Sequence, residues 1–339
     1  MSNKSYKYLK LNGKVGVVIN QLNSTSAIDL NKRLDFRILL VGPTGSGKSS
    51  FIEALADDRK MGISKNQLEG FTQTVTAYEL VNIKNPRGGG FSLLDCPGFS
   101  DSNLSEMEII EMVKKWMSES EFGFLWLHAV LYFYPITDTR LPGTRRKTME
   151  MLKALIKSSS RGSSANGNQN EGAVTIVTTM WDQVWCERLE QRAEERYTQL
   201  KDGVWKEMVE KGAGITKFMN TQESALDILD EVLDNWRKTY GVAYDIKQME
   251  SAPLKETGHG LFLYQDLISR IAMARQRQTA VQLEEEASAD EPALKVLFQE
   301  EHKQLARLLE KYEQQLTLFV NPPEPTGADL ASSLILPSV

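Results

Sequence analysis

Short apolar runs alternate with amphipathic stretches through the middle of the chain, from residue 35 to residue 240. The run Phe36–Val41 is apolar at nearly every position, as expected of a parallel strand buried on both faces. Comparable runs predict further strands at 75–83, 91–95, 129–134, 173–178 and 215–219. Helical spacing of apolar residues predicts helices at 49–56, 105–119, 144–157, 184–211 and 222–240. Strands that alternate with helices predict an α/β fold with a doubly wound, mostly parallel sheet.

Two local signals refine this topology. The segment Asn85–Gly90 contains a proline and three glycines, so it predicts a hairpin turn and one antiparallel strand within the sheet. Ser105 stands directly ahead of a helical pattern, where a serine hydroxyl caps the first free backbone N–H groups of a helix. Both signals favour the same order of elements as the apolar pattern.

The ends of the chain differ from this α/β domain, which we assign to residues 35–240 with a polar, flexible insertion at 158–172. Residues 1–34 predict an N-terminal arm, in which Val15–Ile19 forms either a short strand or an ordered segment lying on the domain. Residues 241–320 predict a helical extension, and the proline-containing residues 321–339 a disordered tail.

The extension contains two helical patterns, at 261–282 and 293–320, separated by a charged break. The second pattern has an apolar stripe at Leu294, Leu297, Leu305, Leu308, Tyr312 and Leu316. Such a stripe either docks on the rest of the chain or pairs with another chain. The sequence alone leaves both options open.

The segment after the first apolar run carries a strong chemical signal. Residues Gly42 to Ser49 match the spacing Gly-x-x-x-x-Gly-Lys-Ser/Thr of a phosphate-binding P-loop. Glycines let consecutive backbone N–H groups point at phosphate oxygens, Lys48 supplies a charge for the β- and γ-phosphates, and the Ser49 hydroxyl ligates Mg²⁺. The predicted phosphate-binding residues are Gly42, Thr44, Gly45, Ser46, Gly47, Lys48, Ser49 and Ser50. The sequence therefore predicts a protein that binds a nucleoside triphosphate.

A second phosphate-site signal follows where a strand ends. Asp95-Cys96-Pro97-Gly98 has the pattern Asp-x-x-Gly, in which the carboxylate holds Mg²⁺ through water and the Gly98 N–H contacts the γ-phosphate. Thr74, between the first helix and the next strand, is our candidate for a threonine that binds Mg²⁺ only with triphosphate. Lys48, Thr74 and Gly98 are thus the candidate catalytic residues, and Ser49, Thr74 and Asp95 the candidate metal ligands.

Candidate base-reading residues follow the last two strands. Thr179-Met180-Trp181-Asp182 occupies the position of Asn/Thr-Lys-x-Asp in guanine-specific proteins, with Met180 in place of the lysine. The Asp182 carboxylate can accept both guanine N1–H and the exocyclic amine, and Met180 can cover the ring by dispersion. Asn220 stands where a loop closes over the base. The alternative for both Asp182 and Asn220 is a helix N-cap.

The motifs LLVGPTGSGKSSFIEAL, LLDCPGFSD, VTIVTTMWD and FMNTQESALDIL together resemble a large fungal group of G-domain GTPases. This group is similar to the septin-like branch, which includes the GTPases of immunity-associated proteins and the chloroplast import-receptor GTPases. The resemblance covers approximately residues 35–240 and implies that this segment is a G domain. It implies binding of GTP and GDP with Mg²⁺, and pairing of two G domains across their nucleotide faces.

One departure from Ras-like switches concerns hydrolysis. Those proteins carry a water-orienting glutamine directly after Asp-x-x-Gly, and here that position is Phe99. We expect slow intrinsic hydrolysis, unless a partner or a dimer completes the site with an arginine. Arg140, at the carboxyl end of a predicted strand, either serves a facing subunit or phosphate or is a solvated surface residue.

Composition narrows the class of protein. The net charge of −5 gives no reason to expect nucleic acid as a partner, and two cysteines and three histidines provide neither a disulfide framework nor a zinc-site spacing. The most apolar stretch, 122–136, is shorter than the ~20 residues of a membrane span, so we predict no transmembrane segment and a cytoplasmic location.

These observations predict a Mg²⁺-dependent GTP-binding protein with slow GTP hydrolysis, acting as a nucleotide switch or a nucleotide-gated homodimer on an unidentified effector protein. Two alternatives stay open: a non-hydrolysing nucleotide-binding scaffold, and an ATP-using P-loop NTPase, since a P-loop alone does not select the base.

Overall fold

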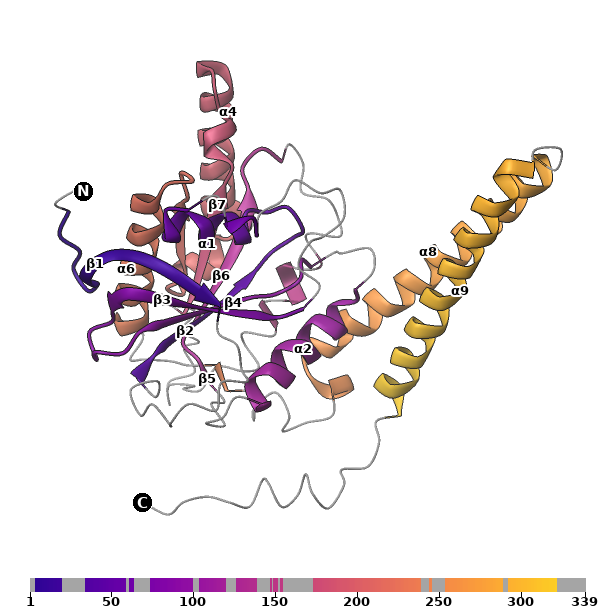
Figure 1. The fold of residues 1–339 in the computed structure, drawn as a ribbon, viewed down its shortest axis with the longest axis horizontal. Coiled ribbons are helices and arrows are strands. Elements are labelled where there is room, and N and C mark those ends of the chain that lie inside the picture. The colour runs from indigo at the N-terminus through magenta and orange to yellow at the C-terminus, as the bar shows by residue number, and fades with distance from the viewer. Residues whose placement is uncertain are drawn as a thin grey trace, which may run out of the picture. The chain divides into compact units, whose positions relative to one another are not determined.

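The computed structural model describes residues 4–19, 34–58, 61–63, 74–99, 104–119, 126–138, parts of 147–154, 173–238, 244–245, 254–288 and 292–321. It divides into two compact units, 1–251 and 252–339. The first contains a mostly parallel sheet with helices, and the second is helical (Figure 1). The predicted insertion 158–172, the tail after residue 321 and Arg140 lie outside the described residues.

The main sheet has seven strands in the order β1-β3-β4-β2-β6-β7-β8. Strands β4, β2, β6, β7 and β8 run parallel, whereas β1 and β3 are antiparallel to their neighbours. The strands span Lys10–Ile19 (β1), Phe36–Val41 (β2), Thr76–Lys84 (β3), Phe91–Asp95 (β4), Ala129–Pro135 (β6), Val174–Thr179 (β7) and Gly214–Lys217 (β8). A short pair, β5 (Trp126–Leu127) and β9 (Tyr244–Asp245), forms a separate two-stranded sheet.

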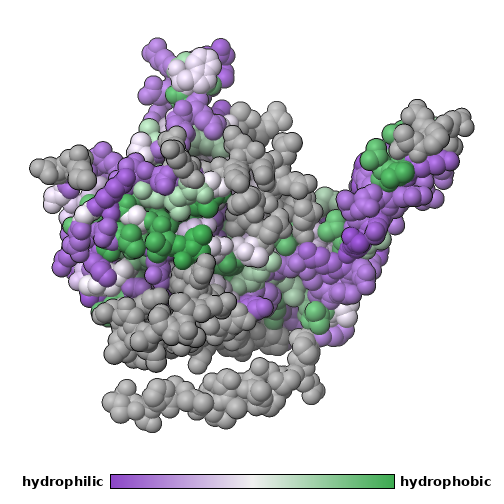
Figure 2. All heavy atoms as spheres, viewed as in Figure 1, coloured by the Kyte–Doolittle hydropathy of each residue, from purple (hydrophilic) through white to green (hydrophobic). Residues whose placement is uncertain are grey.

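The predicted hairpin and the α/β class are confirmed, because β3 and β4 pair antiparallel within an otherwise mostly parallel sheet. The arm was left with two options, and it forms a strand: β1 pairs antiparallel with β3, with a register shift between Leu11 and Gly16. At the end of this edge strand, Val18 and Ile19 are 47% and 54% exposed, and Figure 2 shows apolar side chains gathered on this side of the sheet.

Helices cover both faces of the sheet. On one face, α1 (Lys48–Ala56) and α6 (Gln222–Lys238) contact each other and bury Phe51 and Leu229 in a core that also contains Leu131 and Phe133 of β6. Side chains alternate across a strand, so Tyr132 points to the opposite face. There its ring lies 5.2 Å from that of Trp205. This two-sided burial explains why β2, β4, β6 and β7 are buried at every position.

The prediction of one long helix at 184–211 was wrong. A 3₁₀ turn (Trp181–Gln183) precedes α4 (Glu187–Gln199), which passes through a π-helical segment (Leu200–Val204) before α5 (Lys206–Glu210). The Trp205 N–H donates to the carbonyl of Leu200 at 2.7 Å, five residues earlier. This wider turn lets both Leu200 and Trp205 be buried. Periodicity alone does not show such a break, because both segments read as helical.

The predicted cap of α2 (Glu106–Glu119) is confirmed. The Ser105 hydroxyl accepts the N–H of Glu108, and the Glu108 carboxylate accepts the N–H of Ser105 in return. This reciprocal capping box satisfies two backbone donors at once. Of the helix predicted at 144–157, the residues that the structure describes are helical.

The second unit contains a 3₁₀ turn (Leu254–Glu256) and a hairpin of two long helices, α8 (Gly260–Ala287) and α9 (Pro292–Val320). Leu305, Tyr312 and Phe319 are buried at seven-residue spacing on α9, as in a helix seam. The stripe therefore packs in part on α8 of the same chain, although Leu297 is 64% exposed. Figure 2 shows a mostly hydrophilic hairpin surface with apolar side chains towards its turn. Of the helices that the structure describes, none is both long and apolar enough to cross a membrane.

Candidate functional site

The site lies where the strand order reverses. Strand β2 has β4 on one side and β6 on the other. The connection that leaves β2 leads to β3 on the β4 side, whereas the connection that leaves β4 leads to β6 on the opposite side. Open α/β sheets bind ligands beyond the carboxyl ends of their strands at such a point. The segment from Gly42 to Gly47 leaves β2 at this end and leads into α1.

The backbone of this loop requires glycine. Gly42, Gly45 and Gly47 have φ angles of 149°, 74° and 94°, a region that favours glycine. A Cβ on Gly42 would lie 2.6 Å from the carbonyl oxygen of Phe133, so β6 also leaves no room for a side chain. Thr44 and Gly45 are exposed at the tip of the loop, whereas Ser46 is fully buried. The loop is therefore shaped by backbone conformation and by contact with β6.

The N-terminus of α1 is suited to an anion. Its N-cap is Gly47, which has no side chain to accept the first N–H groups, and its first turn holds no acidic residue. Lys48 is only 6% exposed, and its ammonium donates to the carbonyls of Gly42 and Pro43 at 3.0 Å each. The N–H groups of a first helical turn, the positive end of the helix dipole and a cation thus converge on one loop. Ser50 lies in the same first turn.

Two of the predicted metal ligands meet beside this loop. The Ser49 hydroxyl donates a hydrogen bond of 3.0 Å to Oδ2 of Asp95, whereas Oδ1 of Asp95 is buried without a hydrogen-bond partner. Burial raises the pKa of the Asp95 carboxyl, and the Lys48 charge and the Ser49 hydrogen bond act in the opposite direction. A hydroxyl and a buried carboxylate with an unused oxygen fit a hard divalent cation such as Mg²⁺.

The Asp-x-x-Gly segment packs directly on the P-loop. A Cβ on Gly98 would lie 2.3 Å from the backbone nitrogen of Thr44, so this close approach depends on glycine. The next residue, Phe99, donates its N–H to the carbonyl of Gly42 at 3.1 Å, and its side chain is 2% exposed. The residue at the glutamine position of Ras-like switches is therefore a buried aromatic held against the loop.

The base segment is joined to the phosphate loop by Thr179. Its hydroxyl donates to the carbonyl of Ser46 at 2.8 Å, and its methyl carbon would lie 3.4 Å from a Cβ on Gly47. The next residue, Met180, has a φ of 62°, and its sulfur accepts a hydrogen bond from the Thr137 hydroxyl at 3.3 Å. The carboxyl end of β7 is thus held to both the P-loop and the end of β6.

Asp182 and Asn220 come together from different loops. The Asn220 amide donates to Oδ2 of Asp182 at 2.8 Å, and Asp182 is exposed. Neither residue is the N-cap of the following helix: Cys186 precedes α4, and the Thr221 hydroxyl accepts the N–H of Ser224 at the start of α6. The capping alternative for these two residues is therefore wrong in this structure.

The remaining candidate, Thr74, is exposed in a bend two residues before Thr76, the register partner of Asp95. Its side chain makes no hydrogen bond within the described part of the chain. Direct contacts thus join the P-loop to Asp95, Gly98 and Thr179, and a separate contact joins Asp182 to Asn220. Ser50 follows the P-loop on α1, and Thr74 makes no such contact among the described residues. In the described residues, no group of three or more His, Cys, Asp and Glu side chains forms a further metal site.

Two residues beside the base segment were not predicted. Thr137 holds the sulfur of Met180, and the Lys217 ammonium lies 4.4 Å from the ring centroid of Trp181. Thr137 follows β6, whose last residue Pro135 pairs with Thr179 of β7. Because the carboxyl ends of neighbouring parallel strands lie side by side, the sequence could have indicated that Thr137 lies near Met180. For Lys217 the sequence contains no comparable signal, because its contact depends on how α4, β7 and β8 pack.

Comparison with protein families bears on this site. Residues 37–159, about a third of the chain, match the family model described as 50S ribosome-binding GTPase. This segment is similar to a P-loop GTPase domain. The match contains the P-loop, Asp95 and Gly98 but ends before Thr179, so the base segment lies outside it. A comparison with curated protein sequences found no significant match.

Two solved structures show distant similarity. Toc33 from Arabidopsis thaliana in complex with Mg²⁺ and GMPPNP has 14% identity and a TM-score of 0.41, over 62% of this chain and 88% of that chain. NFeoB of S. thermophilus bound to GDP.AlF4- has 13% identity and a TM-score of 0.35, over 83% of this chain and 92% of that chain. At this level of similarity they do not identify a ligand or a partner of this chain.

Proposed function

We propose that this protein binds GTP with Mg²⁺ and hydrolyses it slowly. The observation that carries the proposal is the hydrogen bond from Thr179 to Ser46, because it joins a phosphate loop to a base-reading segment in one site. The match to a GTPase family supports the phosphate half of this site. The narrower resemblance to a fungal, septin-like branch and the cytoplasmic location remain predictions.

Each residue has a role that follows from its position. The P-loop N–H groups and Lys48 hold the phosphates, and the Ser49 hydroxyl and the Asp95 carboxylate hold the cation directly or through water. Bound Mg²⁺ neutralises charge that develops on the phosphate oxygens. The backbone of Gly98 lies close to Thr44, and we assign its N–H to the γ-phosphate.

Guanine selection rests on Asp182. Its Oδ1 atom makes no hydrogen bond in the described part of the chain, while Asn220 holds Oδ2 and thereby orients the carboxylate. A carboxylate can accept the N1–H and the exocyclic amine of guanine, whereas adenine presents no such pair of donors. Met180 takes the place of the usual lysine and covers the guanine ring with its apolar side chain. Thr137 holds the Met180 sulfur by a hydrogen bond.

Slow hydrolysis follows from Phe99. Its buried ring and its backbone bond to Gly42 leave no polar side chain at the position that orients water in Ras-like proteins. We expect a rate of about 10⁻⁴ s⁻¹ or below, on the order of unstimulated Ras.

The test is a titration of nucleotide-stripped protein with fluorescent GTP and ATP analogues, with and without Mg²⁺. We expect Mg²⁺-dependent binding with a preference for GTP, and loss of triphosphate binding by at least about a hundredfold in Lys48→Ala. Lys201→Ala, which removes an exposed lysine on the π-helical segment, should bind as the unmodified protein does. Equal affinity for ATP would refute the guanine assignment, and retained binding in Lys48→Ala would refute the phosphate site.

We also propose that the nucleotide state changes the loops at Thr74 and after Gly98 and thereby controls pairing of two copies or binding of an effector. Phe99 supports a role in which turnover is secondary to binding, since it supplies no catalytic group. Size-exclusion chromatography with GDP and with a non-hydrolysable GTP analogue tests the pairing. Different dimer fractions in the two states support it, and identical elution at all protein concentrations contradicts it.

A further inference from the structure

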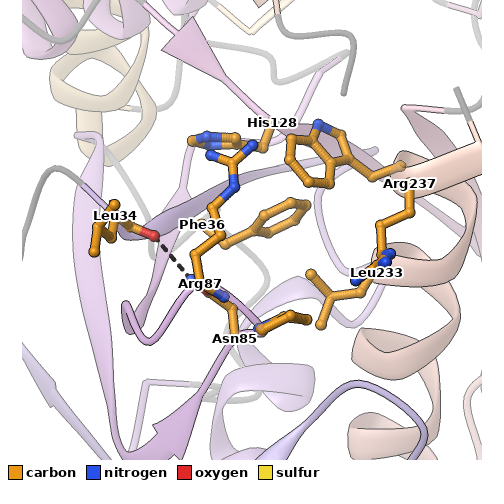
Figure 3. A pocket seen from close by; sticks show the side chains of 9 residues that line it. Leu34, Phe36, Asn85, Arg87, His128, Leu233 and Arg237 are labelled. Carbon is orange, nitrogen blue, oxygen red and sulfur yellow. Dashed lines mark hydrogen bonds between the residues drawn. The ribbon is translucent and has the colours of Figure 1, made fainter. Parts of the chain in front are cut away.

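A pocket lies at the end of the sheet opposite to the P-loop. It has a volume of about 200 Å³ and is lined by Leu34, Phe36, Asn85, Pro86, Arg87, His128, Leu233, Trp236 and Arg237 (Figure 3). Phe36 is the first residue of β2 and the P-loop follows its last, so the length of this strand, roughly 17 Å, separates pocket and nucleotide site. The pocket therefore belongs to a different part of the domain from the site described above.

The walls are aromatic and apolar. The rings of Phe36 and His128 stack with centroids 4.9 Å apart, and Trp236 packs edge-on against Phe36 at 5.2 Å. Leu233 lies on α6 one turn before Trp236 and extends the apolar lining of the pocket along this helix (Figure 3). His128 and Trp236 are also in contact, with ring centroids 5.7 Å apart, so the three rings form one cluster, and a further flat ring can pack against its surface by edge contact.

His128 contributes a hydrogen-bond donor of fixed orientation. Its Nδ1 accepts the backbone N–H of Arg37 at 3.0 Å, so in the neutral ring the proton is on Nε2. Burial, together with the charges of Arg37 and Arg87, lowers the pKa of His128 to about 3, which keeps the ring neutral near pH 7. No hydrogen-bond partner of Nε2 is present in the described chain.

Two guanidinium groups reach the same pocket from different elements. Arg87, in the turn between β3 and β4, lies 4.5 Å from the ring centroid of Trp236, and Arg237 on α6 lies 5.0 Å from that of Tyr8. Neither side chain forms an ion pair within the described residues. The described residues that line the pocket include no aspartate or glutamate, although the whole chain carries a net charge of −5. Two guanidinium groups and a histidine N–H that face a pocket with no carboxylate in its described lining favour the binding of an anionic ligand.

We propose that this pocket binds a small organic anion, consisting of one aromatic ring with a carboxylate or phosphate group. The ring lies against the cluster of Phe36, His128 and Trp236, and the acidic group accepts hydrogen bonds from Arg87 and Arg237. A cavity of about 150 Å³ holds benzene, so a volume of about 200 Å³ fits one substituted ring. Specificity for the anion comes from the two arginines.

The probes for the test are benzoate and phenyl phosphate, with benzyl alcohol as the neutral counterpart. Binding is followed on the full chain through the indole N–H resonance of Trp236, which is assigned by its disappearance in Trp236→Phe. We expect saturable shifts of this resonance with at least one of the two acids, and a clearly weaker effect of benzyl alcohol. No saturable shift with either acid would overturn the proposal.

Arginine variants show whether the acidic group is held as proposed. Arg87→Ala and Arg237→Ala should each weaken binding of the acid roughly fivefold, as expected for exposed charge pairs. Arg192→Ala, on the exposed surface of α4, is the matched control and should leave the affinity unchanged. Equal affinities in all three variants would contradict the site, provided that thermal unfolding and GTP binding show that each variant is folded.

Discussion

The two ends of the parallel strands are built in different ways. At the carboxyl end, the site consists of backbone groups and small side chains: Gly42, Gly98 and Ser49 bring loops so close that a Cβ does not fit at the glycines. At the amino end, the pocket consists of large side chains such as Trp236 and Arg87. The glycines at the carboxyl end cannot be replaced without moving a loop. By contrast, replacing a side chain that lines the pocket at the amino end changes the shape or charge of the pocket.

We expect the two ends to differ in function and in their sensitivity to substitution. In the proposed function, phosphate binding depends on the fold of one loop and one helix terminus, and guanine selection depends on Asp182 and its partner Asn220. Substitutions at the carboxyl end should therefore change nucleotide affinity, and substitutions at the amino end should change stability or binding in the second pocket.

The largest effect is expected from Gly98→Ala. Its Cβ would lie 2.3 Å from the backbone nitrogen of Thr44, so the P-loop or the Asp-x-x-Gly segment must shift. Misplacement by about 1 Å costs on the order of a hundredfold, and we expect GTP affinity to fall by that factor in fluorescence titrations. Gly203→Ala is the control, because no atom lies within 4 Å of its added Cβ. An unchanged affinity in Gly98→Ala would show that the close approach is not needed for binding.

The second prediction concerns stability at the opposite end. The folded state lowers the pKa of His128 from 6.5 to about 3, so between these values the unfolded chain binds a proton that the folded chain does not. The free energy of unfolding therefore falls with decreasing pH, by about 1.4 kcal/mol per unit below pH 6.5 from this group.

Urea unfolding at pH 7.5 and pH 5.0 measures this contribution. The unmodified protein should lose about 2 kcal/mol more than His128→Gln over this interval. His302→Gln, in the second unit, should behave as the unmodified protein does. GTP affinity at pH 7.5 should be similar in all three proteins, and a large loss in His128→Gln would contradict the separation of the two ends.

The third prediction separates base selection from phosphate binding. Asp182→Ala removes the acceptor for the two guanine donors, so the preference for GTP over ATP should fall about tenfold while ATP affinity stays the same. Glu187→Ala, an exposed acidic residue at the start of α4, should keep the preference. If both variants kept it, the base would be read by other residues.

The smallest effect is expected at Asn220, which orients Asp182 without replacing it. Its φ is 55°, so Asn220→Gly removes the side chain while permitting the backbone. We expect about threefold weaker GTP binding from the loss of one exposed hydrogen bond. Asn220→Ala adds backbone strain and should weaken binding further. Equal affinity of both variants and the unmodified protein would mean that the bond to Asp182 does not orient it.

Much of the fold and half of the site could be read from the sequence, because their signals are local. Continuous apolar runs mark buried strands, and the glycines, Lys48 and Ser49 stand at a spacing that specifies a phosphate loop before any packing is known. Asp95 was found in the same way, since it ends an apolar run. The sequence by itself therefore determined the α/β domain and predicted that it binds a nucleoside triphosphate.

Only the tertiary structure decided which distant residues meet. The pairing of β1 with β3 and the contact of Trp205 with Tyr132 join segments whose patterns carry no information about each other. For Asp182 and Asn220 the sequence predicted a shared site, and the structure added the hydrogen bond between them. The pocket at the amino end has the same origin, since Arg87, His128 and Trp236 lie far apart along the chain. Such contacts depend on how helices pack across a sheet, and local propensity does not encode that packing.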